Sequence, residues 1–373
     1  MATETSTAAT IEGFAAHRVS LPIDPPQLSG GHRIASIDLN LVEAHAGEHT
    51  GVGYSFAFSP LEADSVQPLI RYLGEPLVGS PVTAVRTHWA QMWKRLGTFL
   101  GRSGPPMMAL SAIDVALWDL HCRRLGRPLA DVLGLPRLEV PLYGAGGFLS
   151  DTEEHVITEA LSFRDAGFRA YKMRAGGPDL DEDVRRVYGV REAIGPEMKL
   201  MLDVNQAWDV NTTVRAMRDL EGARLHWLEE PLDAEDFEGL AEVRRRAPMA
   251  IAAGETVYGL APLIRMLELG SVDVLQPDLM RCGGITGFLE IAAHARAAKV
   301  VVAAHLFTEI SPHLMALSGA GNMTEYLPGW FDPLFDGAPD PSHGVVRAGD
   351  APGLGLSLAA DLGSDRLRGT VRF

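Results

Sequence analysis

Ionisable residues end seven successive apolar runs in the second half of the chain. The runs end at Lys172 with Arg174, Asp203, Glu229, Glu255, Asp278, His305 and Glu325. From Asp203 onward, consecutive residues of this set are 20 to 27 positions apart, which is the length of one strand–helix unit. In a parallel barrel all strands end on the same face, so these side chains are expected to meet at one mouth, where barrel enzymes carry their active sites.

Three of these residues, Asp203, Glu229 and Glu255, end neighbouring predicted strands. Carboxylates brought this close repel one another and raise each other's pKa values, and a divalent cation between them removes the conflict. Oxygen ligands favour Mg²⁺ or Mn²⁺ over zinc. The three residues therefore predict a Mg²⁺ site. Glu230 is expected to face away from it in a supporting contact, and His226 is expected to be a packing or surface residue.

The remaining residues would surround this site with cations and a base. Lys172 and Arg174 are two residues apart on one strand, so they point to the same face and oppose the three carboxylates. Asp278 ends the strand before that of His305, an order in which a carboxylate can orient an imidazole and raise its basicity. This set suits abstraction of a proton α to a carboxylate, with the cations stabilising an enediolate. Glu325, if protonated, could donate a hydrogen bond to the same oxygen.

Two segments of different character must position these residues. Up to about residue 136, strand patterns at 32–46 and 51–58 precede helical patterns at 61–74, 82–101 and 107–125, which is typical of an α+β domain. The Pro- and Gly-rich stretch 22–34 predicts a mobile loop, and residues 1–15 predict a disordered tail. From residue 138, eight apolar runs alternate with seven helical patterns, which predicts parallel strand–helix units closing into a barrel.

The composition argues against two broad classes of function. The formal net charge of -15 is opposed to nucleic-acid binding, which requires a basic face. No apolar stretch approaches the roughly 20 residues that a membrane helix needs. Cys122 and Cys282 have no metal-ligand spacing and are expected to be buried thiols in a reducing cytoplasm.

Several motifs occur in order and at barrel spacing: GFRAYKMRAG, LDVNQAW, WLEEPL, GETV, DLMRCGGITG and HLFTEISPHL. On these motifs, and on GVGYSFAFSPL, SAIDVALWDL and PGLGLSL, most of the chain resembles the enolase superfamily and, within it, the mandelate racemase subgroup. The resemblance implies an α/β fold, a modified (β/α)7β TIM barrel at 137–336. An α+β capping domain would be formed by 16–136 and completed by 337–373. A homo-oligomer acting on a small-molecule carboxylate is also expected.

The resemblance implies roles for individual residues as well. Asp203, Glu229 and Glu255 are implied as Mg²⁺ ligands, Asp278 and His305 as a dyad, and Glu325 as the hydrogen-bond donor to the substrate carboxylate. Asn205 would lie near the substrate's α-hydroxyl. The loop at 22–34 would cover the mouth, where His32 and Arg33 either contact hydroxyls or a second carboxylate of the substrate or are surface residues.

One position departs from the racemase pattern, which carries Lys-x-Lys where this chain has Lys172-Met173-Arg174. Arginine holds its proton far more tightly than lysine and makes a poor base. A reaction with His305 as its one base is therefore favoured: dehydration of a sugar acid to a 2-keto-3-deoxy acid. Racemisation or epimerisation of a 2-hydroxy acid is the alternative. A barrel that only binds a ligand is disfavoured, because no metal carboxylate and neither member of the dyad is missing.

Overall fold

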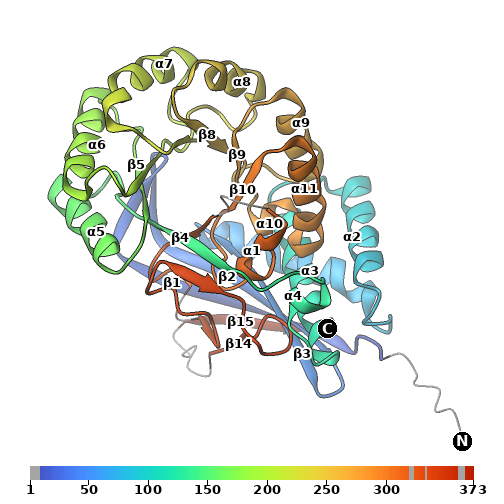
Figure 1. Cartoon of the computed structure of the whole chain (residues 1–373). Coiled ribbons are helices and arrows are strands. Elements are labelled where there is room, and N and C mark those ends of the chain that lie inside the picture. Colours follow the sequence, from blue (N-terminus) through green and yellow to red (C-terminus); the bar gives the residue numbers. More distant parts are fainter. Residues whose placement is uncertain (1–8, 319–322, 332–333, 360–365) are drawn as a thin grey trace, which may run out of the picture.

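The computed structural model describes residues 9–318, 323–331, 334–359 and 366–373 (Figure 1). Its centre is a closed barrel of eight parallel strands, and β11 closes the barrel by pairing with β4. The strands are β4 (Glu139–Ala145), β5 (Ala170–Arg174), β6 (Lys199–Asp203), β7 (Trp227–Glu229), β8 (Ala250–Ala253), β9 (Val274–Leu275), β10 (Val301–Ala304) and β11 (Met323–Tyr326). Each coincides with a predicted apolar run, so the barrel prediction is confirmed.

Helices connect the barrel strands on the outside. They are α5 (Glu153–Asp165), α6 (Leu180–Ile194), α7 (Val210–Asp219) with η2 (Glu221–Ala223), α8 (Phe237–Arg246), α9 (Leu260–Leu269), and α10 (Leu279–Cys282) with α11 (Gly284–Ala298). The last connection differs from the prediction of a seventh helix. Its described part contains only the 3-10 turns η3 (Ser311–His313) and η4 (Met315–Leu317). Pro312 fits the first turn of η3, where its missing N–H leaves no hydrogen bond unmade.

The inside of the barrel is built in layers. One layer is apolar and consists of Tyr143, Ala170, Met201, Trp227, Ala252, Val274, Ala303 and Met323. Successive side chains of a strand alternate between its two faces, so the residue two positions further along also points inward. Six of these eight positions hold polar residues, namely Lys172, Asp203, Glu229, Gln276, His305 and Glu325, and the other two hold Ala145 and Gly254. The apolar layer therefore supports a polar layer at the carboxyl ends of the strands.

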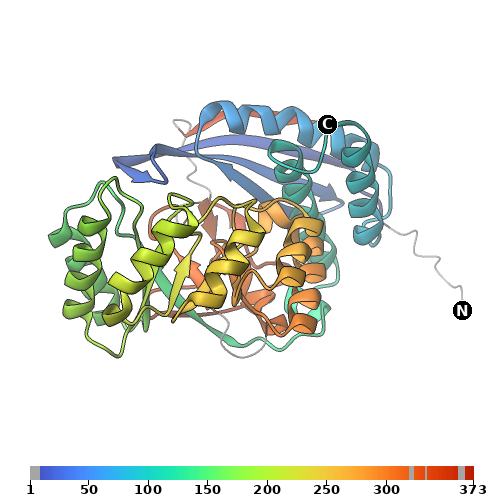
Figure 2. The ribbon, with the colours of Figure 1, turned by 90° about the horizontal axis from the view of Figure 1, so that it is seen from above.

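A separate antiparallel sheet lies across one side of the barrel (Figure 2). Its strands are β1 (Gly13–Ser29), β2 (His32–Ala46), β3 (His49–Ala57) and β15 (Leu367–Arg372), in the order β15-β1-β2-β3. Its helices are α1 (Pro60–Gly74), α2 (Val85–Phe99), α3 (Pro105–Arg124) and the short α4 (Leu129–Val132), with η1 (Glu75–Leu77) after α1. This sheet with its helices is the capping domain that the sequence predicted.

The predicted buried helix, α3, joins the sheet to the barrel. Nearly all of its side chains are buried, and Gly126 follows its end with a φ of 64°. Strand β3 lies directly against it, because a Cβ on Gly53 would stand 2.3 Å from the carbonyl oxygen of Ala112. Gly51 is equally confined by the carbonyl of Ala116. The two glycines therefore permit an approach that any larger residue would prevent.

Two predictions for the N-terminal part are wrong. The expected loop at 22–34 is instead the end of a β-hairpin, in which β1 reaches Ser29, β2 begins at His32, and the pairing is irregular only between Pro22 and Gln27. Gly30 and Gly31 form its turn with φ values of 53° and 75°, the sign that a tight hairpin turn requires. Residues 9–15 of the expected tail are ordered: Ile11 is buried and β1 begins at Gly13. Residues 1–8 lie outside the described part of the chain.

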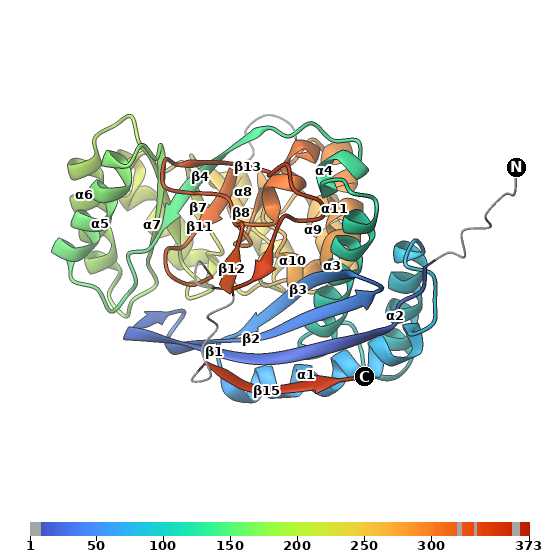
Figure 3. The same ribbon diagram turned by 90° about the horizontal axis from the view of Figure 1, so that it is seen from below.

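The C-terminal segment does not belong to the capping sheet alone. Strand β13 (Val345–Arg347) pairs with β4 of the barrel, β12 (Phe335–Asp336) pairs with β14 (Ser357–Leu358), and β15 joins β1 of the capping sheet (Figure 3). The first residues of β4 extend beyond the barrel ladder, and β13 satisfies their free backbone groups. The prediction that 337–373 completes the capping domain therefore applies to β15 and not to β13.

Two smaller expectations can also be compared with the structure. Among the described residues, no helix combines the length and apolar character needed to cross a membrane. Cys122 and Cys282 are both buried and form no disulfide, as expected.

Candidate active site

The polar layer of the barrel brings the predicted carboxylates together. Asp203 ends β6, Glu229 ends β7, and Glu255 follows β8. One oxygen from each lies within 4.8 Å of the others, and all three residues are buried. Burial raises the pKa of Glu229 to about 7, despite the neighbouring Lys172 ammonium. Burial also raises the pKa values of Asp203 and Glu255. Three buried carboxylates that resist ionisation are a favourable setting for a divalent cation.

An unsatisfied acceptor strengthens this fit. Glu255 Oε2 is buried and makes no hydrogen bond to the described residues. An all-oxygen donor set suits Mg²⁺. A second group that could hold a metal consists of Glu255, His305 and Glu325. In this group one ligand would be His305 Nε2, a nitrogen that suits Mg²⁺ less well than a carboxylate oxygen. The residues at the first group therefore fit a Mg²⁺ ion better than those at the second.

The cationic pair on β5 faces the carboxylates, as predicted. Lys172 Nζ lies 2.5 Å from Glu229 Oε1, 3.0 Å from Glu325 Oε1 and 3.5 Å from Asp203 Oδ2. Arg174 Nε lies 3.4 Å from Asp203 Oδ2. Burial lowers the pKa of Arg174, but Asp203 and Glu325 outweigh it and raise the pKa above its usual value. Arg174 therefore keeps its proton. Its Nε and Nη1 make no hydrogen bond to the described residues, although the side chain lines the open cavity.

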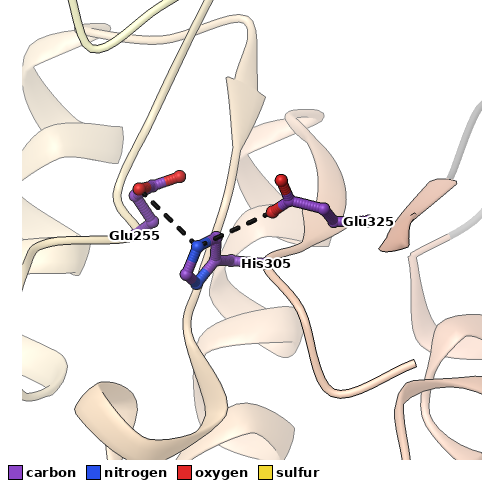
Figure 4. A group of neighbouring side chains, drawn as sticks. All are labelled: Glu255, His305 and Glu325. Carbon is purple, nitrogen blue, oxygen red and sulfur yellow. Dashed lines mark ion pairs between the residues drawn. The ribbon is translucent and has the colours of Figure 1, made fainter. Parts of the chain in front are cut away.

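His305 and Asp278 form a close pair. His305 Nδ1 lies 2.6 Å from Asp278 Oδ2, and Nε2 lies between Glu255 and Glu325, 3.6 Å from an oxygen of each (Figure 4). Burial lowers the pKa of His305, but Glu255, Asp278 and Glu325 together raise it to about 9. The imidazole is thus a stronger base than free histidine, with Nε2 directed at the centre of the site.

Glu325 is ionised rather than protonated. Burial raises its pKa, but Lys172, His305 and Arg174 lower it to about 2. This differs from the expectation of a neutral hydrogen-bond donor. The reason is that three cationic groups, Lys172, His305 and Arg174, face this carboxylate. A donor role for Glu325 therefore requires that it gains a proton after a substrate binds.

Asn205 and Glu230 lie on loops directly above the carboxylates. Asn205 donates from its backbone N to Asp203 Oδ1 at 2.9 Å and from Nδ2 to Asp203 Oδ2 at 3.1 Å. Glu230 is buried and accepts hydrogen bonds from Thr256 Oγ1 at 3.0 Å and Gln206 Nε2 at 3.2 Å. It thus supports the loops on either side of the site, as expected. His226 is half-buried and packs against Trp227, with the two ring centroids 5.4 Å apart, also as expected.

A cavity of about 750 Å³ opens above these residues. Its floor includes Arg174, Glu255, His305 and Glu325, and its walls include His32 and Arg33 from the hairpin. Both of these side chains are exposed. The cavity therefore joins the barrel mouth to the capping domain.

Sequence reasoning missed several residues of this site. Gln206, Thr256, Arg281, Phe148 and Trp330 line the cavity. Gln206, Thr256 and Arg281 stand within the quoted motifs, which was a signal that could have been used. Gln276 was also missed: it is buried in the polar layer, and neither end of its amide is hydrogen-bonded to the described residues.

Comparison with known proteins identifies relatives over most of the chain. Residues 155–362 match the family model described as enolase C-terminal domain-like, and residues 17–134 match the mandelate racemase / muconate lactonizing enzyme N-terminal domain. L-talarate/galactarate dehydratase of Salmonella typhimurium is 34% identical over 311 residues, which are 83% of this chain and 77% of that protein. The 3,6-anhydro-alpha-L-galactonate cycloisomerase of Streptomyces coelicolor is 33% identical over 340 residues, which are 90% of this chain and 93% of that protein.

Solved structures also match this chain over nearly its whole length. L-talarate dehydratase from Polaromonas sp. JS666, complexed with Mg and L-glucarate, matches with a TM-score of 0.89. The two proteins are 31% identical, and the match covers 98% of this chain and 99% of that chain.

Proposed function

The chain belongs to the mandelate racemase / muconate lactonizing enzyme family of the enolase superfamily, and on this basis we propose that it dehydrates a sugar acid to a 2-keto-3-deoxy acid. The cofactor is Mg²⁺, and Asp203, Glu229 and Glu255 would hold it. When bound, Mg²⁺ supplies positive charge that stabilises the negative charge developing on the substrate carboxylate.

His305 is the base of the proposed reaction. Its Nε2 accepts the proton from the α-carbon, and the electron pair of the C–H bond moves towards the carboxylate to give an enediolate. Asp278 holds Nδ1 and so fixes the direction of Nε2. Glu255 would be engaged by the cation, so its charge would no longer favour the protonated imidazole. The ring could then accept a proton near neutral pH.

Lys172 and Arg174 stabilise the anion formed in this step. Both are buried cations on the same side of the layer, and preorganised charge in a site closed to water stabilises a developing anion strongly. The β-hydroxyl then leaves with the proton held on His305, as water. The resulting enol tautomerises to the 2-keto-3-deoxy acid, so the reaction needs no oxidant and no further reactant.

One observation favours dehydration over racemisation. A two-base racemase needs a second group that can exchange a proton on the opposite face, and Arg174 occupies the position of that base in the family pattern. The surrounding carboxylates raise the pKa of Arg174 further. Elimination of water requires one base only, which later acts as an acid on the same face.

The residues of the hairpin are an argument for a substrate whose distal end is polar. We place His32 and Arg33 near that end, where they would contact hydroxyls or a second carboxylate. The Salmonella relative is named for talarate and galactarate, and the Polaromonas structure holds L-glucarate. These names support a sugar acid of similar size. The cytoplasmic location and the homo-oligomeric state stay predictions from the sequence.

The test is a screen of sugar acids and sugar diacids with the purified chain and Mg²⁺. Formation of a 2-keto-3-deoxy acid from one or a few of them is expected, and it can be measured as the semicarbazone. His305→Asn is the inactive control. Interconversion of epimers without any keto acid would contradict the proposal and favour the racemase alternative.

A further inference from the structure

The tip of the β1–β2 hairpin rests on the loop that follows β6. Ser29 Oγ donates a hydrogen bond to Asn205 Oδ1 at 2.6 Å, although the two residues are 176 positions apart in the sequence. The backbone is equally close, because a Cβ on Gly30 would lie 3.3 Å from Asn205 Cβ. The tip therefore contacts Asn205 itself, and not only the rim of the barrel.

Asn205 connects the hairpin tip to Asp203. Its backbone N and its Nδ2 donate to the two carboxylate oxygens of Asp203, at 2.9 and 3.1 Å. Asn205 is held in a left-handed conformation with a φ of 44°, which places both donors on one side. If the amide were turned by 180°, its oxygen would face the carboxylate and repel it. The Ser29 hydroxyl donates to the amide oxygen and so favours the orientation in which Nδ2 faces Asp203.

We propose that Ser29 is a positioning residue that acts through Asn205 on Asp203, so that docking of the hairpin tip and binding of a divalent cation stabilise each other. The inference rests on the proposed function, because it takes Asp203 as one of the cation's ligands. The effect is reciprocal: if the docked tip raises cation affinity, the cation must favour the docked tip by the same factor. Asn205 Oδ1 retains a second lone pair, so the contact leaves an acceptor for a substrate hydroxyl.

Other contacts of the tip provide a matched control. Trp330 Nε1 donates to Gln27 Oε1 at 3.3 Å, and Leu149 N donates to Leu28 O at 3.0 Å. Neither contact involves Asn205. A variant that loses the Gln27 contact removes one long hydrogen bond of the tip but leaves the Ser29–Asn205–Asp203 connection, and with it the docked tip, in place. Comparing it with a Ser29 variant separates a general docking effect from the specific connection.

The experiment measures Mn²⁺ binding to the full chain without substrate, by the electron paramagnetic resonance signal of free Mn²⁺. Ser29→Ala is expected to weaken binding about three- to ten-fold, the effect of losing one hydrogen bond. Ser29→Thr keeps the hydroxyl and is expected to bind like the unmodified chain. Gln27→Ala is expected to change the affinity for Mn²⁺ by less than about two-fold, because it removes a single weak contact.

A second measurement follows the hairpin. Mn²⁺ is expected to slow amide hydrogen exchange at residues 27–33 in the unmodified chain and much less so in Ser29→Ala. Equal Mn²⁺ affinity of Ser29→Ala and the unmodified chain would overturn the inference, as would an equal loss in Gln27→Ala. If the unmodified chain bound no Mn²⁺, the proposed cation site would fail, and the role of Ser29 would fail with it. The two failures are therefore distinguishable.

Discussion

Asp278 uses both of its carboxylate oxygens to fix His305. Oδ2 accepts from Nδ1 of the imidazole at 2.6 Å, while Oδ1 accepts from the backbone N–H groups of Met280 and Arg281 at 2.8 and 3.2 Å. The start of α10 thus holds the carboxylate, and the carboxylate holds the ring. His305 Nε2 is left to face Glu255 and Glu325 (Figure 4). This is the geometry of a base with one defined direction of attack.

Removal of divalent cations should abolish turnover. The three buried carboxylates would then lose the positive charge that offsets their burial and mutual repulsion, both of which raise their pKa values. Activity is measured after treatment with a chelator, after the chelator has been dialysed away, and after addition of Mg²⁺ or Mn²⁺. Restoration by either ion is expected. Full activity of the cation-free enzyme would contradict the assignment.

His305→Asn should eliminate the reaction, because no second base is available on the opposite face. In ²H₂O the unmodified enzyme should remove or exchange the α-proton of substrates with a single configuration at that carbon, which proton NMR can follow. Asparagine keeps a hydrogen-bonding side chain, so the far-ultraviolet circular dichroism spectrum should be unchanged. Exchange of both enantiomers of one 2-hydroxy acid at similar rates would instead support racemisation.

Arg174→Ala should slow the reaction on the order of 10²- to 10³-fold, the typical loss for one preorganised electrostatic partner. Arg174→Lys is the variant to compare with it. It keeps the positive charge but introduces a group that can release its proton, so it should retain more activity than alanine and should begin to exchange substrates of the opposite configuration. Wild-type rates in Arg174→Ala would show that the guanidinium does not act on the reacting centre.

The free energy of unfolding should depend on pH through Asp114, a residue that lies far from the candidate cation ligands in the sequence. Asp114 accepts from Thr286 N and Oγ1 at 2.8 and 2.7 Å and joins α3 to α11. Burial raises its pKa from 3.8 to about 7. Between these values the folded state keeps a proton that the unfolded state has lost, so the free energy of unfolding should fall as the pH rises from about 4 to 7.

Asp114→Asn should reduce this slope. The difference in the free energy of unfolding between pH 5 and pH 7 should shrink by about 1 to 3 kcal/mol, measured by urea denaturation at each pH. Glu290→Gln provides the control, because Glu290 lies on α11, the helix that carries Thr286, but is half-exposed and pairs only with Arg86 at the surface in the described structure. An unchanged slope in Asp114→Asn would place the pH dependence elsewhere.

The barrel and its polar layer could be predicted because each depends on a local pattern. Seven of the eight predicted strands end in an ionisable residue, and these residues recur at the length of one strand–helix unit. Such a residue lies at the mouth of the barrel whatever the detailed packing. The hairpin could not be predicted in this way. Its strand β1 contains Pro22, Pro25 and Pro26, which argue against a strand and outweigh the hairpin signal of Gly30 and Gly31.

Contacts between distant segments could not be predicted for a different reason. The hydrogen bond from Ser29 to Asn205 joins the capping hairpin to a barrel loop, and no spacing within either segment indicates the other. The ionised state of Glu325 likewise depends on three cations that converge only in the folded barrel. Residue type at one position indicates what chemistry is available there, whereas charge state is a property of the assembled site.

The pairing of β15 with β1 has a consequence for how the protein is made. Phe14 and Phe373 exchange two backbone hydrogen bonds, N to O at 2.8 and 3.0 Å, so a strand that is translated after the barrel supplies the partner of β1, which is translated before it. Until then β1 has an open edge, while the whole barrel has already been synthesised. A nascent chain is thus exposed to pairing with its neighbours on the polysome throughout its translation. Loss of β15 is therefore expected to cause aggregation during synthesis before it changes the chemistry of the site.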